Sequence, residues 1–187
     1  MCTWFYADYK PLSTIIDKAQ KLSLTSAIMN AMSKPLINCR IETADQKPMW
    51  KDSWFRRRCV IPASWYYEWG IPPSEVGFHN ANEQHKIKKE KYAIQPEGTE
   101  ITYLAGLYRF EEHRGVQIPM FAVLTRESVA PVSEIHDRMP LILGKESLND
   151  WIRPNGDPQS IAKKALTKMI MEKAKDYPEP KPDFMRC

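Results

Sequence analysis

Six short segments rich in β-branched and aromatic residues lie between Cys59 and Leu143, and they constrain the fold more than any other feature of this sequence. The segments are Cys59–Ile61, Trp65–Trp69, Tyr92–Gln95, Ile101–Phe110, Met120–Thr125 and Leu141–Leu143. Each has the composition and length of a β-strand. Because strands and helices do not alternate regularly along the chain, the pattern favours an α+β fold over a doubly wound parallel sheet.

Helical patterns flank this strand-rich region. Apolar spacing from Ser13 to Met32 predicts one helix or two. Trp50–Arg57 is predicted to form one or two helical turns with Trp50 and Trp54 on the same face. From Ser160 to Lys175 the spacing of apolar residues predicts an amphipathic helix. Its apolar face would contain Ile161, Ala165, Leu166, Met169 and Ile170.

Length and composition fit one domain. A chain of 187 residues can bury one substantial core, and neither an internal repeat nor a domain boundary is evident. We therefore expect a single compact domain over residues 1–177 and a loose Pro-rich tail over residues 178–187. The polar Gly70–Glu90 segment is predicted to be a mobile insertion, and Cys2–Tyr6 a short strand. The net charge of +4 is too small to indicate a polyanionic partner by itself.

The cysteines argue against a disulfide scaffold or a metal site. The four are Cys2, Cys39, Cys59 and Cys187, and none forms a C-x-x-C pair. We expect no metal, no cofactor and no disulfide, and no catalytic role for the last three. The start of the chain is too polar for a signal peptide, and no apolar run approaches about 18 residues. The expectation is a soluble cytoplasmic protein that does not contact a membrane.

Cys2 is the first candidate for chemistry. A small residue after the initiator Met allows an aminopeptidase to remove that Met, which leaves Cys2 with both a thiol and a free α-amine. The α-amine has an ordinary pKa of about 7.7–8.0, so a useful share is nucleophilic at cellular pH. A 1,2-aminothiol condenses with an aldehyde to an imine, which the thiol closes to a thiazolidine ring. A cysteine at this position can equally have no function.

Glu68 and His136 are the candidates for proton transfer. Glu68 lies among aromatic residues, where burial would raise the pKa of its carboxyl group; simple alternation would instead point it at solvent. His136 lies beside Arg138 and can shuttle protons or can be a surface residue. Thr125, at the end of a predicted strand, offers a hydroxyl group whose role is equally open.

Six sequence blocks follow one another along residues 1–143. They are M-C at the start, N-x-R-x-E-T from Asn38, R-C-x-I-P-A-x-x-[FY]-[FY]-E-W from Arg58, A-G-L-[YW] from Ala105, V-L-T ending at Thr125 and I-H-D-R-M-P from Ile135. Each block alone is a weak signal, whereas six in this order are specific. On these blocks the chain resembles the SRAP family, the SOS response-associated peptidase domain.

The resemblance implies a fold, a function and a set of residues. The implied fold is a compact α+β domain around a curved, barrel-like mixed or antiparallel sheet with peripheral helices. The implied function is the capture of ring-opened abasic sites in single-stranded DNA by a monomer, through a thiazolidine crosslink to the N-terminal cysteine. The implied catalytic residues are Cys2, Asn38, Glu68 and His136.

The residues expected to contact DNA come partly from the resemblance and partly from residue type. The resemblance implies that Arg40 and Arg138 hold phosphates and that Thr125 lines the pocket. Arg58 ends a run of three arginines that could grip further phosphates, and Trp69 is an aromatic residue that could stack on a base. A solvated helix face explains such an arginine run equally well.

The chain departs from the family pattern near its start. Thr3 and Trp4 follow the cysteine where family members commonly have C-G-R, and neither an N-x-A-P strand nor a W-G loop occurs between residues 9 and 34. Two other activities stay open: a cysteine-type (auto)peptidase with Cys2 as nucleophile and His136 as base, and a noncovalent single-stranded DNA-binding module. A denaturant-stable adduct would separate the three.

Overall fold

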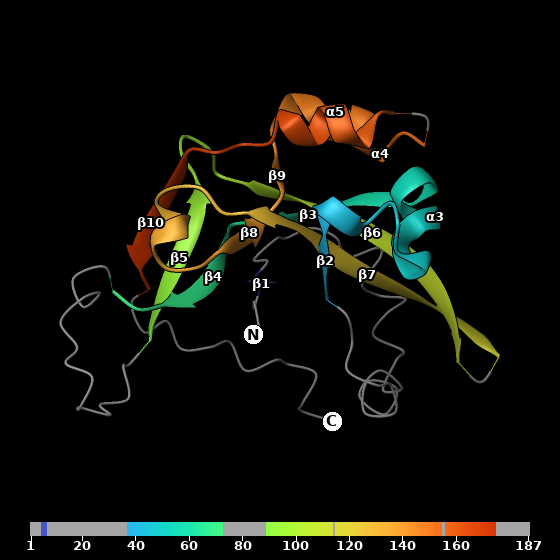
Figure 1. Cartoon of the computed structure of the whole chain (residues 1–187), viewed down its shortest axis with the longest axis horizontal. Coiled ribbons are helices and arrows are strands. Elements are labelled where there is room, and N and C mark those ends of the chain that lie inside the picture. The colour runs from blue at the N-terminus through green and yellow to red at the C-terminus, as the bar shows by residue number, and fades with distance from the viewer. Residues whose placement is uncertain (1–4, 7–36, 73–88, 114, 155, 175–187) are drawn as a thin grey trace.

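Two β-sheets form the centre of the molecule, and short helices cover one side of the larger sheet (Figure 1). The computed structural model describes residues 5–6, 37–72, 89–113, 115–154 and 156–174. The strands are β1 (Phe5–Tyr6), β2 (Asn38–Arg40), β3 (Arg58–Ala63), β4 (Trp65–Gly70), β5 (Glu90–Pro96), β6 (Thr102–His113), β7 (Val116–Glu127), β8 (Arg138–Pro140), β9 (Ile142–Leu143) and β10 (Met169–Lys173). The α-helices are α3 (Pro48–Arg56), α4 (Leu148–Ile152) and α5 (Pro158–Lys163), and the 3-10 turns are η1 (Ile41–Thr43), η3 (Val132–Glu134) and η4 (Lys145–Ser147).

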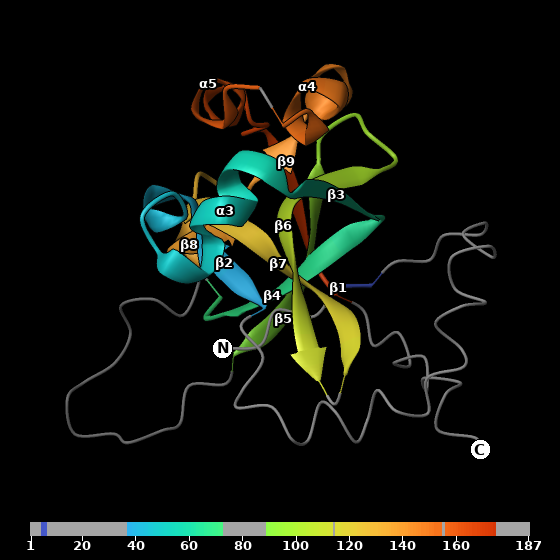
Figure 2. The ribbon, with the colours of Figure 1, turned by 90° about the vertical axis from the view of Figure 1, so that its right-hand side faces the viewer.

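The larger sheet is mixed. Its strand order is β2-β7-β6-β3, with β8 on β7 and β9 on β6. β2 runs parallel to β7, whereas the other pairs are antiparallel. β6 and β7 form a long twisted hairpin, whose far end points toward the viewer in Figure 2. The smaller sheet has the order β1-β4-β5-β10 and is antiparallel throughout.

Side-chain alternation along β6 and β7 divides the core in two. Ala105 and Leu107 pack with Trp54 of α3 and Trp151 of α4 on the helix side of the larger sheet. Leu104 packs on the opposite side, in a cluster shared with the smaller sheet. Both faces of the larger sheet are buried there, and the buried segments 104–107 and 122–124 contain only apolar residues and one glycine.

Most of the expected elements are confirmed. The structure contains the α+β architecture around a curved mixed sheet, a strand over each of the six predicted segments, and the helix predicted at Trp50–Arg57. Trp50 and Trp54 are both buried, as their spacing predicts. The predicted Ser13–Met32 helix and most of the Gly70–Glu90 insertion lie outside the described residues. Among the described helices, none has the length and apolar character needed to cross a bilayer.

The helix predicted from Ser160 to Lys175 is wrong beyond Lys163. The helix there is α5, which begins after Asp157, whose side chain accepts hydrogen bonds from two backbone N–H groups of the first turn. The chain then forms β10, which pairs with β5 and supplies hydrogen bonds to its backbone. Met169 is buried and Ile170 exposed, as strand alternation requires. The helical spacing was therefore produced by two different elements, of which α5 packs in the cluster on the helix side of the larger sheet and β10 in the cluster shared with the smaller sheet.

Candidate active site

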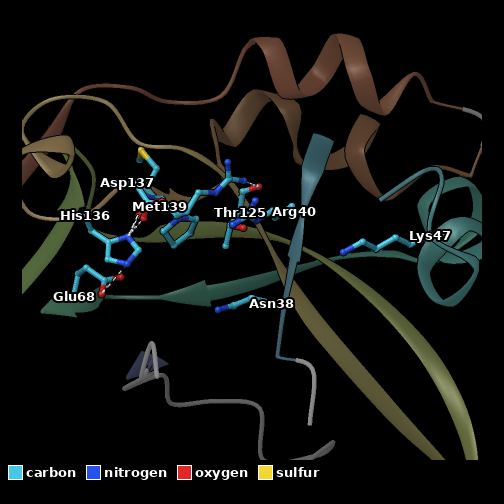
Figure 3. A pocket seen from close by; sticks show the side chains of 10 residues that line it. Asn38, Arg40, Lys47, Glu68, Thr125, His136, Asp137 and Met139 are labelled. Atoms are coloured by element: carbon cyan, nitrogen blue, oxygen red, sulfur yellow. Dashed lines mark hydrogen bonds and ion pairs between the residues drawn. The ribbon is translucent and has the colours of Figure 1, made fainter. Parts of the chain in front are cut away.

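A pocket of about 270 Å³ opens where β2 and β7 of the larger sheet approach β4 and the turn before β8. It is lined by Asn38, Arg40, Lys47, Glu68, Thr125, His136, Asp137, Arg138, Met139 and Pro140 (Figure 3). Six of these ten are residues that the sequence singled out, and they come from segments far apart along the chain. Cys2, the expected nucleophile, lies outside the described residues.

Glu68 is buried in the pocket wall and faces His136. Its side chain is 8% exposed, and Oε1 lies 4.0 Å from His136 Nε2. Burial raises the pKa of the Glu68 carboxyl group, although a hydrogen bond from the Trp69 N–H and the charge of His136 act in the opposite direction. Of the two readings that the sequence left open for Glu68, burial is confirmed.

His136 is held by a turn that satisfies its Nδ1 atom. The Arg138 N–H donates to Nδ1 at 2.9 Å, and the Arg138 carbonyl oxygen lies equally close. Nδ1 can therefore accept from the amide or donate to the carbonyl, so the ring has a partner at Nδ1 in each of its tautomers. The side chain is 9% exposed, and Nε2 has no hydrogen-bond partner among the residues that the structure describes.

The close approach of this turn to β4 depends on a glycine. A Cβ atom at Gly70 would lie 2.3 Å from Ile135 Cβ and 2.8 Å from the Ile135 carbonyl oxygen. Real Cβ atoms do not come this close, so any larger residue at Gly70 would push the turn away from β4. Ser128 Oγ also donates to the His136 carbonyl at 2.6 Å. Both contacts fix His136 beside Glu68.

Asn38 completes the polar part of the pocket. It begins β2, and the register pairs it with Val123 of β7. Among the described residues, its Oδ1 atom has no hydrogen-bond partner although it is buried, and the same holds for His136 Nε2 and Arg138 Nε. Buried polar atoms in proteins are usually paired, so three unpaired ones on residues that line a single pocket indicate a site made for a polar ligand or water.

Arg138 lies beside Thr125 and forms an ion pair with a carboxylate. Its Nη1 and Nη2 atoms donate to the two carboxylate oxygens of Glu42, each at 2.8 Å, and Nη2 also donates to the Thr125 carbonyl at 2.8 Å. This is a bidentate pair between residues 96 positions apart. Glu42 is the Glu of the N-x-R-x-E-T block, but no local signal in the sequence identifies its partner.

The expectation that Arg58 contacts DNA is wrong for this structure. The residue is 4% exposed, and its guanidinium donates to the carbonyls of Trp54, Phe55, Trp151 and Arg153. It also lies over the Trp151 ring, 5.6 Å from the centroid. Its position after α3 and close to the end of α4 explains this: helix ends leave carbonyl groups without partners, and Arg58 supplies the donors.

Trp69 does not line the pocket. Because it follows Glu68 directly on β4, alternation sends its side chain to the other face of the strand. There its ring lies 5.5 Å from Lys91 Nζ, which is also 4.0 Å from the Tyr67 ring centroid. A contact between Trp69 and DNA stays a prediction.

Cys39 and Cys59 are free thiols. Burial raises the pKa of each to about 11. Both are therefore almost entirely protonated near neutral pH, when they are poor nucleophiles. This agrees with the expectation that neither is catalytic or disulfide-bonded; Cys187 lies outside the described residues.

Four of the ten pocket residues were not predicted from the sequence, and two of these four, Lys47 and Asp137, are charged. Lys47 precedes α3 and carries no motif, so only the fold reveals that its side chain reaches the pocket. Asp137 belongs to the I-H-D-R-M-P block, and its Oδ1 lies 3.4 Å from His136 Nδ1 with the side chain 77% exposed. Because Asp137 stands between His136 and Arg138 in this block, the sequence could have identified it as a pocket residue.

Solved structures share this fold. A protein from Bacteroides thetaiotaomicron superposes with a TM-score of 0.59 at 24% identity, covering 80% of this chain and 60% of its own. A protein from Bordetella bronchiseptica gives 0.61 at 21% identity, covering 80% of this chain and 70% of its own. At these identities the likeness concerns the fold alone.

Sequence relatives carry names that refer to abasic sites. Abasic site processing protein YoaM of Bacillus subtilis is 30% identical over 120 residues, which are 64% of this chain and 48% of the relative. Abasic site processing protein HMCES of Xenopus tropicalis is 33% identical over 124 residues, 62% of this chain and 37% of the relative. The chain thus spans about half, or less, of the length of these relatives.

A match to a family model covers more of the chain than the matches to these relatives. The model of the family described as SOS response associated peptidase (SRAP) matches residues 19–178, which is most of the chain. The blocks, the fold and this match agree, and the chain belongs to the SRAP family.

Proposed function

We propose that this chain captures ring-opened abasic sites in single-stranded DNA through a thiazolidine crosslink to Cys2. The observation that carries the proposal is the buried pair of Glu68 and His136, 4.0 Å apart in a pocket that also contains Asn38. The names of the relatives support an abasic-site substrate. The pair offers a buried carboxyl group whose pKa burial raises and an imidazole beside it, and side chains of these two kinds serve as general acids and bases in proton transfers such as those of this reaction.

Strand β1 pairs with β4, the strand that carries Glu68. Phe5 of β1 pairs with Tyr66 of β4, two residues before Glu68. Cys2 is three residues from Phe5, and three residues span at most about 10 Å. The proposal requires the Cys2 amine and thiol to enter the pocket within this reach.

The first step opens the sugar. An abasic deoxyribose is mostly a closed hemiacetal, so opening needs a proton on the ring oxygen and removal of the proton from the C1′ hydroxyl. Glu68, whose pKa burial raises, donates the first, and His136 accepts the second. Asn38 orients the sugar oxygens, since its unpaired Oδ1 accepts a hydrogen bond from a hydroxyl group.

The next steps form the crosslink. The neutral α-amine of Cys2 attacks the C1′ aldehyde, and loss of one water gives an imine. The thiol sulfur then bonds to C1′ while its proton moves to the nitrogen, which closes a five-membered thiazolidine. Aldehyde and aminothiol thus become one ring plus one water, with no oxidant and no cofactor. Met1 must be absent, because an amide nitrogen cannot form the imine.

The test is a denaturing gel of Met1-free protein with a labelled single strand that contains one abasic site. The expected result is a slower band that resists denaturant with unaltered protein. Cys2→Ala and Cys2→Ser keep the α-amine and lose the thiol, so they should give the band only when borohydride reduces the imine. Glu68→Gln keeps the side-chain size but cannot exchange a proton, so adduct formation should slow by roughly 10²–10⁴-fold.

The controls separate the alternatives. The same oligonucleotide without the abasic site should give no band. A full stable adduct with Cys2→Ala would refute the thiazolidine. If unaltered protein binds the strand without an adduct, the noncovalent module is correct, and a transient adduct with peptides alone would favour the cysteine peptidase.

A further inference from the structure

We propose that an exposed aromatic face of the β6–β7 hairpin stacks on bases of the single strand where it leaves the pocket. The face consists of Tyr108 and Phe110 of β6 with their cross-strand partners Phe121 and Pro119 of β7, and we call it the aromatic platform. The proposal rests on the proposed function, since it concerns the undamaged nucleotides beside the abasic site. None of these four residues is among those that the resemblance assigns to catalysis or to DNA.

The rings of the platform are exposed although they are large and apolar. Three phenylalanines among the described residues are at least half exposed, and two of them, Phe110 at 53% and Phe121 at 56%, lie in this face. Neither core cluster contains these two or Tyr108. The hairpin extends beyond both sheets here (Figure 1), because the pairing of β3 with β6 ends at Leu107. The described part of the fold therefore does not use these rings for its core.

The platform lies on the same face of the larger sheet as the pocket. Residues two apart along a strand share a face, so Phe121 lies on the face of Val123 and of Thr125, which lines the pocket. The register places Asn38, another pocket residue, beside Val123. Four residues of strand separate Phe121 from Thr125, which is about 13 Å. A single strand whose abasic sugar is held in the pocket therefore has neighbouring nucleotides within reach of the platform.

The chemistry of the platform suits bases better than phosphates. Tyr108 and Phe110 pack edge to face, with ring centroids 6.0 Å apart, and Phe121 lies across the strands from Tyr108. Aromatic rings on a sheet offer flat apolar surfaces on which bases stack, largely independently of sequence. None of the four residues is a cation, and Glu112, the next residue on this face, would repel a phosphate. The platform therefore binds bases and ends at Phe110, while phosphates remain with the cations of the pocket.

The experiment measures the affinity for an undamaged fluorescein-labelled oligothymidylate by fluorescence anisotropy at a series of KCl concentrations. Phe110→Ala and Phe121→Ala should each weaken binding roughly 5-fold to 150-fold, the range for the loss of one stacked base. The slope of log K against log salt should not change, because no phosphate contact is removed. Phe121→Tyr retains an aromatic ring and should keep the affinity of the unaltered chain.

Phe55→Ala is the matched control. Phe55 is 50% exposed, but it lies on α3, which packs on the opposite face of the larger sheet, and does not line the pocket. Its removal should leave the affinity unchanged. A second arm compares adduct formation on two strands that each contain one abasic site. With subsaturating protein, Phe121→Ala should slow the adduct on a strand with many flanking thymidylates, but not on one with a single nucleotide on each side.

The outcomes separate the proposal from its rivals. If Phe110→Ala and Phe121→Ala bind as tightly as Phe55→Ala, the platform does not bind DNA and the proposal is refuted. It is also refuted if urea denaturation shows that Phe121→Ala is far less stable than Phe55→Ala, since another part of the chain then covers the platform. A dimer that only Phe121→Ala dissociates, seen by size-exclusion chromatography, would assign the face to a second copy and likewise refute the proposal.

The failure of the proposed function would look different. In that case the unaltered chain forms no denaturant-stable adduct with the abasic strand. Binding of the oligothymidylate that weakens in Phe110→Ala and Phe121→Ala would then still support the platform as a surface for single-stranded DNA.

Discussion

Replacing Arg58 by Met tests whether this arginine stabilises the fold or contacts DNA. The side chains are of similar length, but Met has no donors. Two of the acceptors, the carbonyls of Trp54 and Trp151, are bonded to Arg58 in fully buried contacts at 2.6 Å, so water cannot replace the lost donors there. At about 1–3 kcal/mol for each buried acceptor left unpaired, Arg58→Met should lower the free energy of unfolding by about 2–6 kcal/mol.

Arg57 provides the control in the adjacent position. Its side chain is 42% exposed, and its ion pair with Asp52, at 3.0 Å, is also exposed. Such pairs contribute about 0–1 kcal/mol, so Arg57→Met should change stability by no more than that. Both variants remove one positive charge, which makes their comparison independent of net charge.

The assay is urea denaturation followed by tryptophan fluorescence, together with the salt dependence of oligothymidylate binding. Trp54 and Trp151 pack edge to face, with ring centroids 6.2 Å apart, in the core that Arg58 borders. The emission therefore reports on this region. If Arg58→Met and Arg57→Met are equally stable, and only Arg58→Met weakens the dependence of oligothymidylate binding on salt, the structural role is refuted and Arg58 contacts DNA.

Three more predictions follow from the site and its surroundings. The pKa of Glu68 is higher in the folded than in the unfolded chain, so ionisation of Glu68 lowers the free energy of unfolding as pH rises from its ordinary pKa of 4.5 through the raised one. Glu68→Gln should therefore become more stable relative to the unaltered chain across that pH range, as urea denaturation at a series of pH values would measure. Gly70→Ala should lower the free energy of unfolding by about 1–3 kcal/mol and slow adduct formation. Gly98→Ala is the control: Gly98 has a φ of 71° and no atom within 4 Å of an added Cβ, so this variant should lose stability but keep the adduct rate. Equal adduct rates for the two variants would contradict this. At pH 8, iodoacetamide should leave Cys39 and Cys59 unmodified in folded protein and alkylate both in urea, as peptide mass mapping would report.

The strands and the composition of the pocket could be predicted because their signals are local. Runs of β-branched and aromatic residues identify a strand without knowledge of its neighbours. The sequence blocks likewise supplied Asn38, Glu68 and His136, which the fold brings to one pocket. Which face of β4 Glu68 occupies was not predictable from alternation alone, because both faces of that strand are lined by aromatic residues.

The chain beyond Lys163 shows where a local signal fails. Ile161, Ala165 and Met169 have helical spacing and are all buried, as a helix would bury them. A strand at Met169–Lys173 nevertheless forms, because the neighbouring edge of β5 offers unpaired backbone groups. Nothing within residues 160–175 records that edge, so the correct assignment needs the tertiary structure.

The arginines show most directly what the sequence leaves undetermined. Arg40, Arg58 and Arg138 were all expected to hold phosphates, and all three carry the same charge. Arg58 is buried against helix carbonyls, Arg138 is paired with Glu42, and Arg40 is exposed with no carboxylate partner among the described residues. A guanidinium binds whichever acceptor the fold brings nearest, and that acceptor lies up to 96 positions away. The number of arginines in a motif is therefore an upper bound on phosphate contacts, and the pairing of each guanidinium in the folded chain decides how many remain.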